Sequence, residues 1–113
     1  MEIIKNQITV EKLKEMSQKM FGNIVKAVVD VEQGIMAVDG ELHADEEVLL
    51  TENGSKRENV WGINFHPDVV GDDWVEFDSM INLKPHLGNR TRGVDNEATR
   101  KKITEVVNKL VKR

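Results

Sequence analysis

The run from Trp74 to Lys84 alternates its side-chain character more regularly than any other part of this chain. The residues on one side are mostly apolar: Val75, Phe77, Ser79, Ile81 and Leu83. The intervening residues are mostly polar: Glu76, Asp78, Met80, Asn82 and Lys84. Successive side chains of a strand point to opposite faces, so this period of two residues is typical of a strand with one face in the core. We therefore expect a long strand over residues 74–84, followed by a polar loop over residues 88–93.

Further strands are predicted from β-branched and apolar segments that are bounded by turn residues. These segments are residues 24–31, 35–38, 41–50 and 60–66, with a short edge strand over residues 3–8. Gly34, Gly40 and Gly54 lie in the turns between them. Tight turns between consecutive strands favour an antiparallel sheet over a parallel one.

A helix is expected at each end of the chain. Thr9 is a typical helix N-cap, and apolar residues follow it at helical spacing as far as Phe21. A second helix is expected from about Asp95, because the later apolar residues recur at helical spacing. They are Ile103, Val106, Val107 and Leu110.

The predicted fold is a single α+β domain over residues 1–113, a length close to the common domain size. We expect a two-layer, twisted antiparallel sheet of about five strands, with the N-terminal and the C-terminal helix packed on one face. The other face would be exposed, or covered by a second copy of the chain.

The composition restricts the chemistry that the protein can carry out. There are no cysteines, which excludes disulfides, thiolate metal sites and a cysteine nucleophile, and which fits a reducing compartment. No signal peptide and no apolar run of membrane-spanning length is recognisable. We therefore expect a cytoplasmic protein that does not insert into a membrane.

Charge is distributed unevenly along the chain. Residues 1–83 contain 7 Lys and Arg against 17 Asp and Glu, a net charge of −10, whereas residues 84–113 contain 9 against 3, a net charge of +6. The two parts could attract each other within the fold or across a homodimer, or the basic part could meet an anionic partner. Nucleic-acid binding is left open but is not indicated, because most of the few aromatic residues are expected in the core.

Several strings resemble a known family when they are taken together. They are Lys26–Val31, Gly34–Val38, Glu41–Glu47, Asn59–Asn64, Glu76–Asn82 and Gly88–Gly93. The chain resembles, over nearly its whole length, an uncharacterised family of small prokaryotic proteins filed as a domain of unknown function. That resemblance implies a small single-domain prokaryotic protein and no particular mechanism.

One candidate site combines acidic residues with histidine. Glu41, His43, Asp45 and Glu47 would share one face of a strand, and carboxylates with an imidazole can bind Mg²⁺, Mn²⁺ or Ca²⁺. Glu76, Asp78 and Asn82 could similarly meet Asn64 and His66 from the neighbouring strand, and this group could support general acid–base chemistry or hold a metal that activates water. The alternative for both groups is a solvated sheet face.

The second candidate site is the loop Gly88–Gly93. Asn89, Arg90, Arg92 and the loop amides could hold a phosphate or carboxylate group, because the arginine fork suits oxyanions. The alternative is a glycine-directed turn in which the arginines pair with Glu76 or Asp78.

Two hypotheses of function follow. The first is a small cytoplasmic binding module, with no cofactor, that recognises an unknown protein or a small anionic ligand through Asn89, Arg90 and Arg92. The second is a divalent-metal-dependent hydrolase, with phosphoesters as candidate substrates and Mg²⁺ or Mn²⁺ on His43, Asp45, Glu76 or Asp78.

Overall fold

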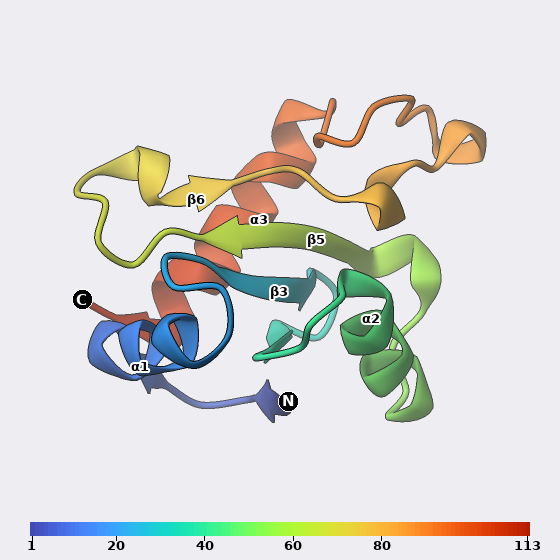
Figure 1. Cartoon of the computed structure of the whole chain (residues 1–113). Coiled ribbons are helices and arrows are strands. Elements are labelled where there is room, and N and C mark those ends of the chain that lie inside the picture. Colours follow the sequence, from blue (N-terminus) through green and yellow to red (C-terminus); the bar gives the residue numbers. More distant parts are fainter.

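The strand β3 (Val25–Asp30) forms the centre of the sheet, and its apolar residues are buried on both faces. The computed structural model describes residues 1–113 and contains five antiparallel strands in the order β1-β4-β3-β5-β6 (Figure 1). The other four strands are β1 (Glu2–Ile4), β4 (Ile35–Val38), β5 (Val60–Phe65) and β6 (Val75–Glu76). β5 pairs with β3 along its whole length, from Val60 opposite Asp30 to Phe65 opposite Val25.

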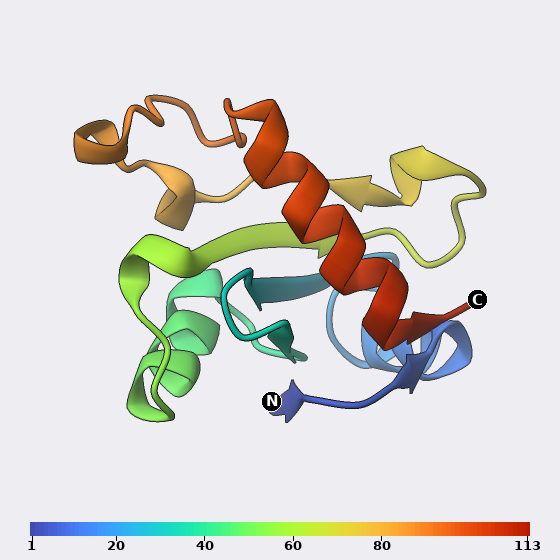
Figure 2. The same ribbon diagram turned by 180° about the vertical axis from the view of Figure 1, so that it is seen from behind.

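One face of the sheet carries the helices α1 (Val10–Met20) and α3 (Glu97–Leu110). Their buried residues, such as Leu13 and Ile103, form one apolar cluster with Ala27, Val29 and Ile63 of the sheet. Figure 2 shows α3 crossing this face from the side opposite to Figure 1. The predicted α+β class, the five-stranded antiparallel sheet and the two terminal helices are therefore confirmed.

The segment before α1 and the segment after α3 lie side by side. β2 (Ile8–Thr9) pairs in parallel with β7 (Val111–Lys112), immediately before α1 and after α3. Thr9 also caps α1 as predicted, because its hydroxyl accepts from the Lys12 N–H at 3.1 Å. The predicted single strand over residues 3–8 is thus divided between β1 and β2.

The prediction of a strand over residues 41–50 is wrong, because this segment forms the helix α2 (His43–Glu52). Its buried side chains are His43, Glu46 and Leu50, which lie at helical spacing but are mostly polar. Leu42 and Val48 are exposed instead, so hydrophobicity alone gives no helical pattern. Leu50 packs with Val28 and Val60 on the second face of the sheet, which is therefore partly covered by the chain itself.

The prediction of a long strand over residues 74–84 is also wrong. Only β6 pairs with the sheet, and the following residues form the 3₁₀ helices η3 (Met80–Asn82) and η4 (Pro85–Leu87). Two other 3₁₀ helices, η1 (Arg57–Asn59) and η2 (Asp72–Trp74), precede β5 and β6. The Ser79 hydroxyl accepts from the Ile81 N–H at 3.3 Å, and such local bonds compete with a strand ladder.

Side chains, and not a neighbouring strand, form hydrogen bonds with the backbone N–H and C=O groups at the free edge of β5. Asn82 is fully buried, accepts from the Gly62 N–H at 2.8 Å and donates to the Gly62 carbonyl at 3.0 Å. Gly62 permits this approach, because a Cβ atom there would lie 2.5 Å from that of Ser79. The Lys84 ammonium donates to the Val60 and Arg57 carbonyls and lies 4.1 Å from the centre of the Trp61 ring. Burial lowers the pKa of Lys84 to about 8.

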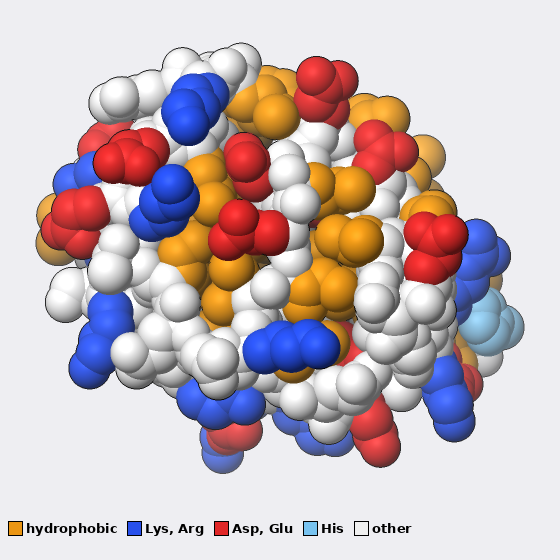
Figure 3. All heavy atoms as spheres, turned by 90° about the horizontal axis from the view of Figure 1, so that it is seen from below, with side chains coloured by type: hydrophobic (Ala, Val, Ile, Leu, Met, Phe, Trp, Pro, Cys, Tyr) orange, Lys and Arg blue, Asp and Glu red, His pale blue; other side chains and the backbone are white.

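The outer surface near β1 and α2 is partly apolar. Met1, Leu42 and Val48 are each at least half exposed. Figure 3 shows this face from below, with hydrophobic side chains gathered across it and both acidic and basic side chains among and around them. None of the three α-helices has both the length and the apolar composition needed to cross a membrane.

Glu46 is a buried acid on the inner side of α2. Its side chain is fully buried, and its Oε2 atom accepts from the Gly40 N–H at 3.0 Å, while Oε1 has no partner. Burial raises the pKa of Glu46 to about 9, against an ordinary value of 4.5. The carboxyl is therefore protonated at neutral pH.

The pH dependence of stability tests this assignment. The native state holds the Glu46 proton more tightly than the unfolded state, so its contribution to stability is complete below pH 4.5 and is lost as the pH rises toward 9. In the wild type, this effect should lower the free energy of unfolding by about 1 kcal/mol per pH unit between pH 5.5 and 7.5. Glu46→Gln should abolish this pH dependence, and urea unfolding at several pH values measures it. The matched control is Glu52→Gln, at an exposed position of the same helix. Equal slopes for wild type and Glu46→Gln would contradict a protonated Glu46.

Candidate functional site

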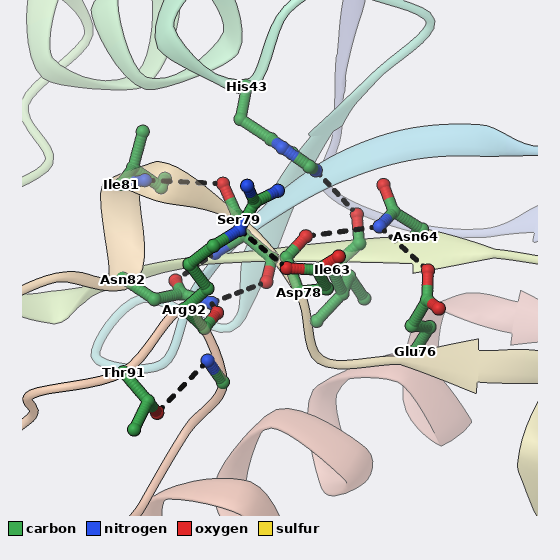
Figure 4. Close-up of polar contacts among 12 residues, drawn as sticks. His43, Ile63, Asn64, Glu76, Asp78, Ser79, Ile81, Asn82, Thr91 and Arg92 are labelled. Atoms are coloured by element: carbon green, nitrogen blue, oxygen red, sulfur yellow. Dashed lines mark hydrogen bonds and ion pairs between the residues drawn. The ribbon is translucent and has the colours of Figure 1, made fainter.

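The second sheet face carries a group of polar side chains beyond the part that Leu50 covers. We call this group the polar cluster. It consists of Lys26, His43, Asn64, His66, Glu76, Asp78 and Arg92. These residues come from β3, α2, β5, β6 and the segments that follow β5 and β6. Figure 4 shows His43 reaching from α2 toward β5, with Asn64, Asp78 and Arg92 close by.

Strand pairing places three members of the polar cluster in a row. Lys26 is opposite Asn64 in the β3–β5 pair, and Asn64 is opposite Glu76 in the β5–β6 pair. The Asn64 amide donates to Glu76 Oε1 and to the Asp78 carbonyl, both at 3.0 Å. Its Oδ1 atom is buried and has no partner, so one hydrogen-bond acceptor of the cluster is unsatisfied. Glu76 Oε1 also lies 3.4 Å from His66 Nε2.

His43 is held in one tautomer. Its Nε2 atom lies 2.8 Å from the Ile63 carbonyl oxygen, which can only accept, so Nε2 carries the proton and Nδ1 has a free lone pair when the ring is neutral. Burial lowers the pKa of His43, and the charges of Lys26 and Arg92 act in the same direction. The Ile63 carbonyl and the Asp78 carboxylate oppose that shift. His43 is therefore mainly neutral at pH 7, between two cations and one anion.

Arg92 has unused hydrogen-bond donors. Its Nε–H donates to Asp78 Oδ1 at 2.8 Å, and both side chains are about half exposed. The two terminal guanidinium nitrogens make no hydrogen bond, so the fork that recognises oxyanions remains open. The Lys26 ammonium has no carboxylate partner and lies 5.2 Å from the centre of the Phe21 ring.

The loop over residues 88–93 already binds an anion from its own chain, the carboxylate of Asp95. The Asp95 carboxylate accepts from the Arg90 N–H at 3.0 Å and from the Thr91 hydroxyl at 2.5 Å. Those two groups lower the pKa of Asp95. The Arg90 side chain is exposed and forms no ion pair. An external anion would therefore have to displace Asp95 from the loop donors.

Asn89 organises the loop from inside. It is buried, and its amide donates to the carbonyls of Asn82, Thr91 and Gly93 at 2.7, 3.2 and 2.8 Å. Its Oδ1 atom accepts from the Asp95 N–H at 2.7 Å. Asn89 thus has no free group for a ligand.

The predicted site residues separate into four positions. His43, Glu76, Asp78 and Arg92 belong to the polar cluster, Asn89 is buried under the loop, and Arg90 is exposed on it. Asp45 lies two residues after His43 on α2, where side chains do not share a face. No group of three or more His, Cys, Asp or Glu side chains is arranged to hold a metal ion.

Lys26 is a member of the polar cluster that sequence reasoning missed. It stands as a lone charged residue within the apolar strand Val25–Asp30, before the terminal Asp30. A cation at such a position is costly to bury, so its presence was the available signal.

The comparisons with known proteins identify a family. The family model described as "Protein of unknown function (DUF5674)" matches residues 2–110. The chain belongs to this family. The predicted resemblance to a domain of unknown function is therefore confirmed. A search of the curated proteins and a search of the solved structures each found no significant match.

Substitution of Asn89 tests its structural role. Asn89→Ala should lower the free energy of unfolding by about 2–4 kcal/mol, because it leaves several buried backbone groups without partners. Arg90→Ala, one residue later at an exposed position, should change it by less than about 0.5 kcal/mol. Both values can be measured by urea unfolding followed by tryptophan fluorescence. Similar values for the two variants would refute the structural role of Asn89.

Proposed function

We propose that this protein is a small binding module that recognises an anionic group, a carboxylate or phosphate, at the polar cluster. The observation that carries the proposal is the open guanidinium fork of Arg92, which uses only Nε for Asp78. Lys26 supplies a second cation without an acidic partner, and both charges act on His43. An anion beside His43 would face two cations and one carboxylate.

The form of the surface favours binding over catalysis. The cavities beside Lys84, beside Asp95 and beside Val48 are lined by residues outside the polar cluster. An enzyme of small substrates usually encloses its reacting groups in a concave pocket, whereas a binding module can present them on an open face. The metal-dependent hydrolase has less support, because its ligands His43 and Asp45 do not share a face of α2.

The cellular location and the oligomeric state of the module are also proposals. A chain without cysteine suits the reducing cytoplasm of a prokaryote. A homodimer is supported only by the opposite charges of residues 1–83 and 84–113, and sedimentation equilibrium at low and high salt would test it.

Sulfate titration followed by amide NMR tests the binding site. Wild-type protein should show saturable shifts confined to Lys26, His43 and the residues around Asp78 and Arg92. Arg92→Gln should weaken binding about tenfold or more, since a charge-assisted fork is lost. Arg90→Gln is the matched control and should bind like wild type. An equal loss of sulfate affinity in both variants, or no loss in Arg92→Gln, would show that the anion binds elsewhere.

The pH dependence of sulfate binding tests the role of His43. Sulfate keeps its charge between pH 5 and 7, whereas an adjacent anion favours protonation of His43, whose pKa is lowered in the free protein by burial. Binding should therefore tighten as the pH falls from 7 to 5. His43→Gln, which retains a donor for the Ile63 carbonyl, should reduce this dependence. An affinity that is constant over this range in wild type would show that the anion does not contact His43.

A further inference from the structure

A hollow of about 390 Å³ lies beside the outer surface of α2, away from the polar cluster. Its apolar lining comes from the first residue of the chain, the end of α1 and the helix α2: Met1, Met20, Val48 and Leu49. Its remaining side chains are all acidic: Asp39, Glu41, Asp45 and Glu52. The hollow therefore combines an apolar floor with an acidic rim.

The apolar floor is unusually accessible. Met1 is 54% exposed and Val48 is 50% exposed, and Leu42, next to Glu41, is 55% exposed. Neighbouring apolar side chains that remain in water and are surrounded by polar residues mark an interaction surface. Val48 belongs to neither apolar cluster of the core, whereas Leu49 is partly buried and packs against the cluster around Leu50.

The rim has little compensating positive charge. The only ion pair that a rim carboxylate forms is the one between Asp39 and the N-terminal ammonium, at 3.9 Å. The acidic residues of the rim would repel anionic lipid headgroups and nucleic acid. They would attract lysine or arginine residues placed on either side of an apolar side chain.

We infer that this acidic hollow binds a basic amphipathic segment of another protein, with an apolar residue inserted against Val48 and Lys or Arg residues at the rim. The protein's own basic helix does not meet these requirements. The apolar residues of α3, such as Ile103 and Val107, are buried in the core, so a second copy cannot offer them. The occupant must carry an apolar stripe that is free before binding.

The test uses a synthetic fluorescein-labelled peptide of 14 residues, with leucine at helical spacing on one face and lysine on the other. Fluorescence anisotropy should show saturable binding to wild-type protein, and a peptide with glutamate in place of lysine should not bind. Val48→Ser, and separately Glu41→Gln with Glu52→Gln, should each weaken binding about tenfold, a difference of about 1.4 kcal/mol. Since all these positions are exposed, the variants should fold normally.

Matched controls separate this hollow from general attraction between opposite charges. Val70→Ser removes a valine that is 91% exposed outside the hollow, and Glu97→Gln removes an exposed acid at the start of α3. Both should bind like wild type. Absence of binding, an equal effect of Val70→Ser and Val48→Ser, or loss only with the acidic variants would overturn the inference. Self-association that Val48→Ser abolishes would assign the hollow to a second copy instead. Arg92→Gln should bind the peptide normally, so failure here is distinguishable from failure of the anion site.

Discussion

The two hydrogen bonds between the Asn82 side chain and the Gly62 backbone are the constraint on which the rest of this structure depends. A strand edge in a buried position must have its N–H and C=O groups satisfied, and β6 reaches only the end of β5. Asn82 supplies one donor and one acceptor to Gly62, as a neighbouring strand would. The Asn82 amide also donates to the Arg92 carbonyl at 2.9 Å, and its backbone carbonyl accepts from Asn89. Two buried asparagines thereby hold residues 77–95 against the sheet almost without regular secondary structure.

This arrangement determines where the functional groups lie. The Arg92 carbonyl is fixed by both Asn82 and the Ser79 N–H, so the Arg92 side chain emerges beside Asp78. α2 approaches from the opposite direction, and its residue His43 forms a hydrogen bond with the Ile63 carbonyl. The polar cluster therefore forms where a strand-like segment and a helix meet over β5. The outer side of the same helix contributes to the acidic hollow, so α2 separates two surfaces of different chemistry.

The elements that follow a simple hydrophobic period could be predicted from the sequence. The helices near residues 10–20 and 97–110, and the strands near 25–30, 35–38 and 60–65, were predicted because apolar residues make up their buried stripes. α2 could not be found in this way, since His43 and Glu46 occupy its buried positions. The alternation over residues 74–84 was misleading, because Asn82 and Lys84 are buried to bond the backbone while Met80 is 62% exposed.

The chemistry of the candidate site was easier to predict than its assembly. The sequence predicts chemically capable side chains at His43, Glu76, Asp78 and Arg92. Their convergence depends on α2, which the sequence pattern predicts as a strand. The sequence predicts Asn89 as a ligand-binding residue. Its side chain instead forms its hydrogen bonds with backbone groups of the loop and its neighbours. Local sequence does not distinguish an asparagine that binds a ligand from one that replaces backbone pairing.

The most direct test of this account is a long-range NMR experiment that detects scalar coupling across hydrogen bonds. The account predicts a correlation between the Gly62 amide nitrogen and the side-chain carbonyl carbon of Asn82. Asn82→Ala should abolish it and should shift the Asp78 and Arg92 resonances together. A Gly62 amide that is coupled to a backbone carbonyl, or that exchanges with solvent as rapidly as the amides of exposed loops, would contradict it.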